Sequence, residues 1–256
     1  MTVKKSANIN VTKPHVGFSY WISLNKNSKV FKDKLSISKF QVHVSNFDID
    51  SKDNFLWEKA NQLYLPGGDG RPTVIEIDKV WSKIRHNASK LAETKEKVFL
   101  RMLPLKFSNT TLENLVKHLS LKYEIKTITY KTESELKKII ENNEFDIKLS
   151  ANDFSSMDLF ENLKTSFNTS RPYIFLKKND KISKLMIDLS KEEVRDIRFS
   201  IFKDIGLRLI SEGYVAPVGF QRIWFYSSKK IDIAEWSNLF PEVSFWKVKV
   251  NDSTNQ

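Results

Sequence analysis

Hydrophobic and polar positions follow the most regular pattern in the middle of the chain. Residues 98–107 (VFLRMLPLKF), 124–130 (EIKTITY) and 145–149 (FDIKL) are apolar or alternating runs typical of strands. The two segments between them carry Leu, Ile and Val at helical spacing, and each opens with a Thr followed three positions later by a Glu, which is a capping-box pattern. Strand, capped helix, strand, capped helix, strand predicts right-handed βαβ crossovers and a partly parallel sheet.

Weaker patterns flank this middle section. Residues 36–44 fit either a strand or a short helix, because their alternation does not separate the two. A long amphipathic helix is predicted from Lys191, and Gly213 lies where a glycine commonly ends such a helix. The other predicted elements are strands at 16–24, 173–178, 184–189, 214–220, 222–227 and 244–250, and helices at 53–64, 78–95, 157–167 and 233–240.

The predicted fold class is therefore α/β, with a mixed, partly parallel sheet flanked by helices. We divide the chain into consecutive segments by these patterns. They are a flexible lead (1–15), a segment with helices (16–97), an α/β lobe (98–190), a long helix with returning strands (191–250) and a polar tail (251–256).

Composition excludes several kinds of chemistry. The 256 residues include no Cys, so disulfides, thiolate metal sites and a Cys nucleophile are excluded. None of the motifs GxGxxG, GxxxxGK[ST] or GxSxG occurs, and none of the four His lies within helical reach of another. No run approaches the roughly 20 apolar residues that span a bilayer. The first 15 residues lack an apolar run, so we expect no signal peptide there.

The formal net charge of +11 makes nucleic-acid binding an alternative function. The lysines are dispersed along the chain, however, which is typical of a solvated surface, so nucleic acid is not the expected partner. A metal-dependent nuclease is a further alternative, because Glu76 and Asp78 precede a Glu-x-Lys at Glu124 and Lys126. An exposed alternating strand face explains Glu124 and Lys126 without chemistry.

Two carboxylates flank the last strand of the regular section. The run FDIKLSANDF places Asp146 at the start of this strand and Asp153 just past its carboxyl end. In an open α/β sheet, ligands occupy the crevice outside the carboxyl ends of the strands, where a carboxylate pairs with a cationic group. Asp153 also fits the cap of a following helix, and the spacing alone leaves both roles open.

The order of the segments resembles the C-terminal half of family 5 of the bacterial extracellular solute-binding proteins, the oligopeptide, dipeptide and nickel binders. The resemblance covers residues 16–250. YWISLNKNSKVFKDKLSISKFQVHVSNFD is similar to the family's strand ending in Asn, followed by "pPFdd" and a helix. The block from VFLRMLPLKF to NEFDIKL resembles "GIkVel…gdyDm.l", and SANDFSSMDLFENL resembles "w.aDYpDp..fl". Ser150, Phe154 and Met157 depart from this last pattern, where Trp, Tyr and Pro are usual.

This resemblance implies a periplasmic-binding-protein-like lobe that binds a peptide or small solute for an ABC importer, without catalysis or a cofactor. Residues 98–190 would form the ligand-binding lobe and residues 16–97 the hinge-proximal segment. Asp153 would pair with the free amino group of a peptide, Phe154 would line the pocket, and Asn152 lies beside them. Family members are about twice this length, so the implied partners are a missing N-terminal lobe and an ABC permease. The family implies a periplasmic or extracellular address, whereas this sequence leaves the compartment open.

Overall fold

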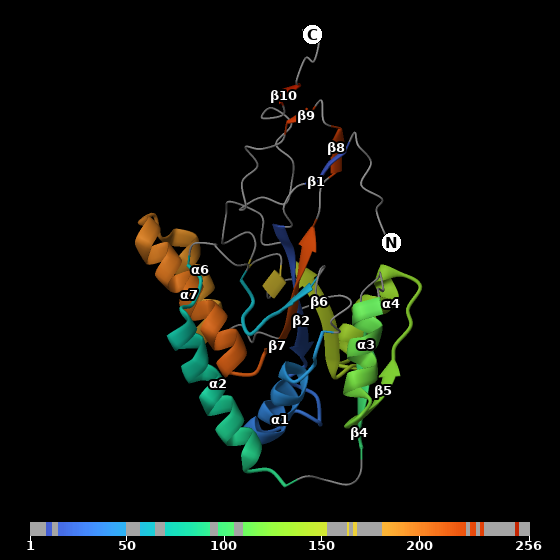
Figure 1. Cartoon of the computed structure of the whole chain (residues 1–256). Helices are drawn as coiled ribbons and strands as arrows, with labels where there is room; N and C mark the ends of the chain where they lie inside the picture. The colour runs from blue at the N-terminus through green and yellow to red at the C-terminus, as the bar shows by residue number, and fades with distance from the viewer. Residues whose placement is uncertain are drawn as a thin grey trace.

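In the computed structural model, the described residues are 9–11, 15–49, 57–64, 70–92, 97–104, 110–152, 163, 166–167, 181–223, 226–228, 231–232 and 249–250. Six of their strands form one mixed sheet at the centre of the structure (Figure 1). These strands are β2 (His15–Leu24), β3 (Trp57–Lys59), β4 (Val98–Leu103), β5 (Tyr123–Thr127), β6 (Ile147–Asn152) and β7 (Val215–Ile223).

The strands lie in the order β3-β7-β2-β6-β4-β5. β4 is parallel to both of its neighbours, β5 and β6. β2 is antiparallel to β6 and β7, and β3 is antiparallel to β7. The predicted α/β fold with a mixed, partly parallel sheet is therefore confirmed, and its parallel part is the regular middle section of the sequence.

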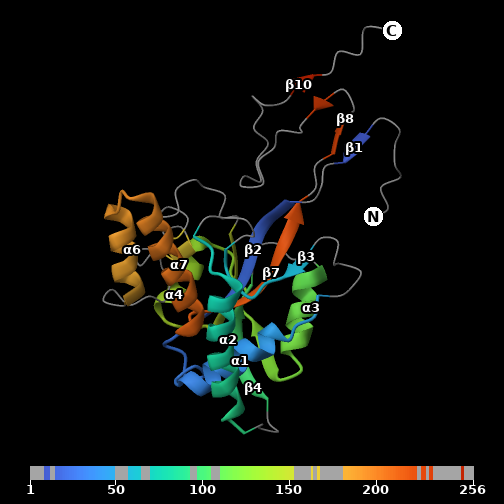
Figure 2. The ribbon, with the colours of Figure 1, turned by 60° about the vertical axis from the view of Figure 1, so that its left-hand side comes forward.

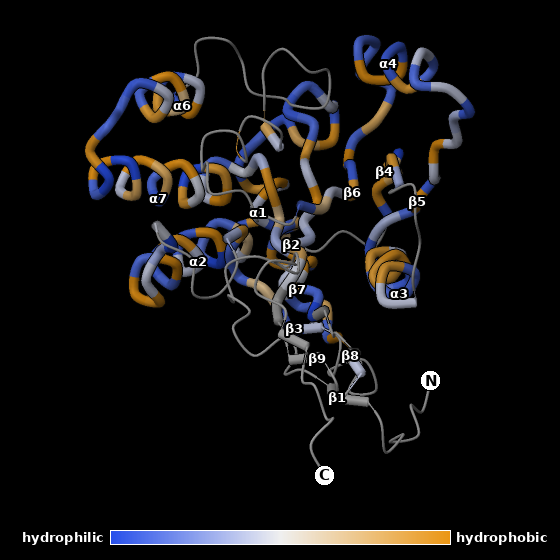
Figure 3. The backbone as a smooth tube through the Cα atoms, turned by 90° about the horizontal axis from the view of Figure 1, so that it is seen from above, coloured by the Kyte–Doolittle hydropathy of each residue, from blue (hydrophilic) through white to orange (hydrophobic). Residues whose placement is uncertain are grey.

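Helices cover both faces of this sheet (Figures 1 and 2). One face packs against α1 (Lys34–Ser45) and α3 (Thr110–Leu119). The other face packs against α2 (Val74–Ser89), α6 (Lys181–Lys191) and α7 (Arg195–Ser211). α4 (Glu133–Glu141) contributes Leu136 and Ile140 to a third cluster with Leu103, and Figure 3 shows α3 and α4 on opposite sides of β4 and β5.

The alternation of β2 explains why both faces need a cover. Tyr20, Ile22 and Leu24 belong to the apolar cluster of α1 and α3, whereas Trp21 belongs to the cluster of α2, α6 and α7. All four side chains are almost completely buried. A central strand that buries large apolar side chains on both faces is stable only between two layers of helices.

Two short antiparallel ribbons lie beyond one end of the sheet, at the top of Figure 1. β1 (Ile9–Val11) pairs with β8 (Tyr226–Ser228), and β9 (Ile231–Asp232) pairs with β10 (Lys249–Val250). No helix in the described ranges combines the length and the apolar character that a membrane crossing requires.

Several elements predicted from the sequence are confirmed. The ambiguous segment 36–44 is part of α1, which begins after Asp33 because the carboxylate of Asp33 accepts hydrogen bonds from the backbone N–H groups of Leu35 and Ser36. Thr132 caps α4 as its capping pattern predicts, since its hydroxyl accepts a hydrogen bond from the N–H of Glu135. Gly213 follows α7 with a φ of 75°, a conformation that favours glycine.

Two predicted elements are wrong. The segment 53–64 is predicted as a helix, but its described part contains strand β3, because Trp57–Lys59 pair with β7 and the ring of Trp57 packs against Tyr20. Residues 184–189 are predicted as a strand, but they belong to α6, whose Ile182, Met186 and Leu189 are buried at helical spacing. The predicted strand at 173–178 lies outside the described residues.

Candidate functional site

The connections of the parallel strands reverse direction at β4. The chain leaves β4 through α3 to reach β5 on one side, and it leaves β5 through α4 to reach β6 on the other side. In open α/β sheets, such a switch point leaves a crevice outside the carboxyl ends of the strands, where ligands bind. The carboxyl ends of β4 and β6 are therefore the candidate ligand-binding position in this sheet.

The two strands end at different levels. Met102 and Leu103, the last residues of β4, pair with Ile147 and Lys148, the first residues of β6. β6 then continues alongside β2 to Asn152, which lies opposite Ser19. At an ordinary strand rise of about 3.3 Å per residue, β6 extends roughly 13 Å beyond the level of Lys148. At the switch point, β6 therefore extends past the last residue of β4, and we call this offset between the two strand ends the step.

One face of β2 and β6 carries polar side chains along this step. The register places Ser23 opposite Lys148, Trp21 opposite Ser150 and Ser19 opposite Asn152. The intervening residues Ile147, Leu149 and Ala151 pack into the α1 and α3 cluster, so the polar ones lie on the opposite face. We call Ser19, Ser23, Lys148, Ser150 and Asn152 the polar row. Central strands covered on both faces are usually apolar throughout, so folding alone does not account for the polar row.

Hydrogen bonds hold part of the polar row in place. The Oγ atoms of Ser23 and Ser150 lie 3.2 Å apart, and Nε1 of Trp21 donates to Oγ of Ser23 at 3.0 Å. Nδ2 of Asn152 donates to Oγ of Ser166. The hydroxyl of Ser19 is buried and has no hydrogen-bond partner in the described part of the chain. An unsatisfied buried hydroxyl of this kind costs the fold free energy, so Ser19 is not explained by folding alone.

Lys148 is the one cation of the polar row. Burial lowers the pKa of its side chain to about 8, because the partly desolvated ammonium loses hydration. Trp21, between Ser19 and Ser23 on β2, stacks against Phe167 with ring centroids 5.6 Å apart. The polar row therefore combines hydroxyl groups, an amide and a half-buried cation beside an aromatic wall.

Of the three predicted ligand-binding residues, the structure describes Asn152, which ends β6 and the polar row. Asp153 and Phe154 follow it directly in the chain and lie outside the described residues. Sequence reasoning missed Ser19, Ser23 and Lys148. The available signal was the alternation of Ser19, Trp21 and Ser23 in one strand and of Lys148, Ser150 and Asn152 in another, which marks a polar face in strands expected to be buried.

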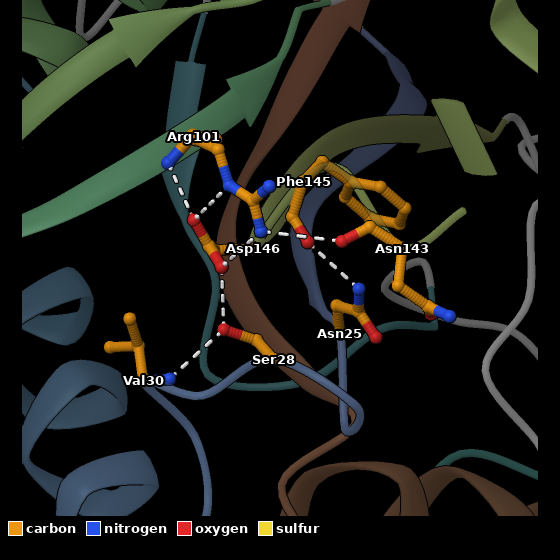
Figure 4. A network of polar contacts seen from close by, with 7 residues as sticks. All are labelled: Asn25, Ser28, Val30, Arg101, Asn143, Phe145 and Asp146. Atoms are coloured by element: carbon orange, nitrogen blue, oxygen red, sulfur yellow. Dashed lines mark hydrogen bonds and ion pairs between the residues drawn. The ribbon is translucent and has the colours of Figure 1, made fainter. Parts of the chain in front are cut away.

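Asp146, the other carboxylate of this strand, lies at the opposite end of β6 and is structural (Figure 4). Its carboxylate accepts hydrogen bonds from Oγ of Ser28 at 2.5 Å, from the backbone N–H of Arg101 at 2.7 Å, and from Nε and Nη2 of Arg101 at 3.1 and 3.2 Å. Burial raises the pKa of Asp146, but the hydrogen bonds from Arg101 and Ser28 outweigh burial and hold the pKa below its ordinary value. Nδ2 of Asn25 donates to the backbone oxygen of Phe145 at 2.7 Å, which joins the end of β2 to the same network.

The residues of the nuclease alternative do not come together. Glu76 completes a capping box with Thr73 at the start of α2 and forms an ion pair with Lys203 of α7 at 2.8 Å. Glu124 and Lys126 lie on the edge strand β5, on the other side of the molecule from α2 (Figures 1 and 3). No group of three or more His, Asp or Glu within the described ranges is arranged to hold a metal ion.

Two histidines that lie 75 positions apart in the sequence, His43 and His118, are in contact in the fold. Nε2 of His43 in α1 lies 3.1 Å from the backbone oxygen of His118, and Nε2 of His118 in α3 lies 2.9 Å from that of His43. The rings stack with centroids 4.4 Å apart. Each ring donates to the last turn of the other helix, so the pair fastens α1 to α3 and serves the fold.

Comparison with solved structures gives the fold a family context. HbpA2 from Haemophilus parasuis superposes with a TM-score of 0.69 at 13% identity, over 96% of this chain and 50% of that chain. DppA from Helicobacter pylori, an ABC transporter-associated periplasmic binding protein in complex with the peptide STSA, gives 0.68 at 17% identity over 96% and 50%. This chain has the fold of family 5 solute-binding proteins.

The family likeness rests on structure. NikA from Brucella suis in complex with Fe(III)-EDTA also superposes, with a TM-score of 0.63 at 13% identity over 95% of this chain and 52% of NikA. The chain thus spans about half the length of these family 5 structures. No family sequence model matches it, and no curated protein sequence does.

Proposed function

We propose that this chain is a non-catalytic solute-binding lobe of an ABC importer system and that its ligand is a peptide or small solute. The observation that carries the proposal is the polar row, which lies on β2 and β6 at the switch point and ends at Asn152, directly before Asp153. Proteins of the same fold include DppA with a bound peptide and AppA from Bacillus subtilis with a bound nonapeptide. No cofactor takes part in the proposed role.

In the proposed site, Asp153 pairs with the free amino group of the ligand, Phe154 lines the pocket and Asn152 provides a polar contact. The step in the sheet supports an extended ligand, because the register pairs β4 with β6 only as far as Lys148. A peptide that lies along Leu149–Asn152 would extend the line of β4 and add a strand there, a recurring mode of peptide recognition. The second lobe needed to enclose the ligand and the permease that receives it are the proposed partners.

The test is a thermal-shift and calorimetry screen with short basic peptides. Peptides with a free amino terminus should raise the melting temperature of the protein, and acetylated versions of the same peptides should not. Asp153→Asn should abolish the shift, because it removes the charge that pairs with the amine. Asp188→Asn, on the exposed surface of α6, is the matched control and should bind as the original protein does.

A peptide library that leaves the melting temperature of the original protein unchanged would refute the proposed peptide binding. Binding that survives Asp153→Asn would instead refute the role of Asp153 and leave the lobe's binding function standing.

A further inference from the structure

The strand β5 forms one edge of the central sheet (Figure 1). β3, at the other edge, has only three residues, and its Glu58 forms an ion pair with Arg222 of β7 at 3.1 Å. β5 has five residues, of which Glu124, Lys126 and Thr127 are exposed. In the part of the chain that the structure describes, Glu124 and Lys126 form neither an ion pair nor a side-chain hydrogen bond. β5 is therefore the edge to which a further strand can be added.

Hydrogen bonding to β4 leaves alternate backbone groups of β5 pointing outward. The N–H of Ile128 donates to the backbone oxygen of Met102 at 2.8 Å, and every second residue back along β5 faces β4 in the same way. The backbone groups of Tyr123, Ile125 and Thr127 therefore point away from β4. Within the described ranges, no hydrogen bond joins them to another segment. Each of the three residues offers one N–H and one C=O to a partner strand.

The sequence of β5 is complementary to itself in an antiparallel pair. A two-fold axis beside Ile125 places this residue opposite its own copy as a hydrogen-bonded pair, because its backbone groups point outward. Glu124 of each copy then lies opposite Lys126 of the other, in pairs whose Cα atoms are about 4.5 Å apart. Opposite charges in such cross-strand pairs stabilise the pairing. A register shifted by two residues in either direction would place two glutamates or two lysines opposite each other, so the charges select one register.

Exposed apolar side chains lie next to this edge. Phe99, which the register places opposite Glu124, is 44% exposed, and Leu121, two residues before β5, is 67% exposed. α4 packs on Leu103, at the other end of β4, and leaves Phe99 partly uncovered. In the antiparallel pair, Lys126 of the second copy lies beside Glu124 and in line with Phe99, so its aliphatic chain can cover the ring. The pairing therefore buries apolar surface in addition to joining charges.

We infer that β5 is a dimerisation edge, at which two copies of this chain pair antiparallel and join their sheets. The occupant is a second copy because the charges and the outward backbone groups match across the same two-fold axis. β4 separates β5 from β6 and the polar row, so the pairing does not depend on the proposed ligand. Five residues from each copy form a small interface, and we expect a reversible dimer with a dissociation constant on the order of 100 µM.

Sedimentation equilibrium of the whole chain, from about 10 µM to about 1 mM, tests this inference. The original protein should change from monomer to dimer as its concentration rises. Glu124→Lys and Lys126→Glu each turn two attractive pairs into two repulsive ones, so each should weaken the dimer roughly 10- to 100-fold. A mixture of these two variants should form a heterodimer, because each then meets the opposite charges on the other. The double variant, with both substitutions in one chain, should dimerise as the original protein does.

Lys184→Glu and Asp188→Lys make the same charge changes on the exposed surface of α6 and should leave the dimer unchanged. Thr127→Pro removes an outward N–H and no hydrogen bond to β4, so it should weaken the dimer while the melting temperature of the monomer stays close to the original. A protein that is monomeric at every concentration, a dimer that persists in Glu124→Lys, or a mixture of the two charge variants that stays monomeric would each overturn the inference.

Discussion

Replacing Asp146 with alanine should destabilise the fold without touching the proposed site. The carboxylate is buried and accepts four hydrogen bonds from Ser28 and Arg101, so its removal leaves the hydroxyl, the backbone N–H and the guanidinium without their acceptor. Breaking a buried ion pair costs about 3–5 kcal/mol. The side chain of Arg101 is 36% exposed and regains hydration, which places the expected loss at the lower end, about 3 kcal/mol.

Urea unfolding at neutral pH measures this loss directly. A loss of about 3 kcal/mol corresponds to a melting temperature lower by roughly 6–12 °C in a chain of this size. Asp188→Ala, at an exposed position, is the control and should stay within about 0.5 kcal/mol of the original protein. Arg101→Met should cost less than Asp146→Ala, because Asp146 keeps its bonds to Ser28 and to the backbone.

The double variant tests the coupling. Its loss should be smaller than the sum of the two single losses by at least about 1 kcal/mol, since the second substitution removes a partner that is already lost. The pKa of Asp146 is lowered in the folded state, so its contribution is complete above the ordinary carboxyl pKa of about 4 and is lost as the pH falls below it. An Asp146→Ala loss below about 1 kcal/mol, or strict additivity, would refute this account of the network.

Three further predictions concern the helices. Burial, and then the nearby charges of His118 and Lys122, lower the pKa of His43. The contribution of His43 to stability should therefore be complete above about pH 6.5 and decline as the pH falls. Melting curves from pH 7.5 to 5 should show a smaller decline for His43→Gln than for the original protein. A β-carbon at Gly206 would lie 2.5 Å from the ring of Tyr64, so Gly206→Ala should cost about 1–2 kcal/mol in urea unfolding despite the better helix propensity of Ala, and an increase in stability would contradict this packing argument. Thr73→Ala removes the cap of α2 and should cost about 1 kcal/mol in the same assay, and an unchanged stability would refute the contribution of this cap.

The parallel half of the fold could be predicted because its signals are local. Thr132 and Glu135 mark the start of α4 within four residues of sequence, and the strands on either side are regular. The errors arose where distant partners decide the local structure. Residues 57–59 form a strand only because β7, about 160 positions later, provides its partner, and an apolar run such as 184–189 fits a strand or a helix until the core it faces is known.

The candidate site was predictable only in part for the same reason. Asn152 could be located because it ends a strand of the parallel series, and carboxyl ends of such strands are recurrent ligand sites. Ser19 and Ser23 come from a strand more than 120 positions earlier, and their register against Lys148 and Asn152 is set by long-range antiparallel pairing. Sequence pattern shows the alternation in each strand, but only the fold joins the two halves of the polar row.

The central position of β2 in the sheet has a consequence for folding during synthesis on the ribosome. Of the six strands in the central sheet, β2 is synthesised first, yet one neighbour, β6, follows more than 120 residues later and the other, β7, about 200 residues later. Contacts between such distant segments are slow to form, and the chain lengthens at about 5–20 residues per second during synthesis. Tyr20, Ile22 and Leu24 therefore spend many seconds without a partner strand, which makes this early apolar segment the natural client of a chaperone during synthesis.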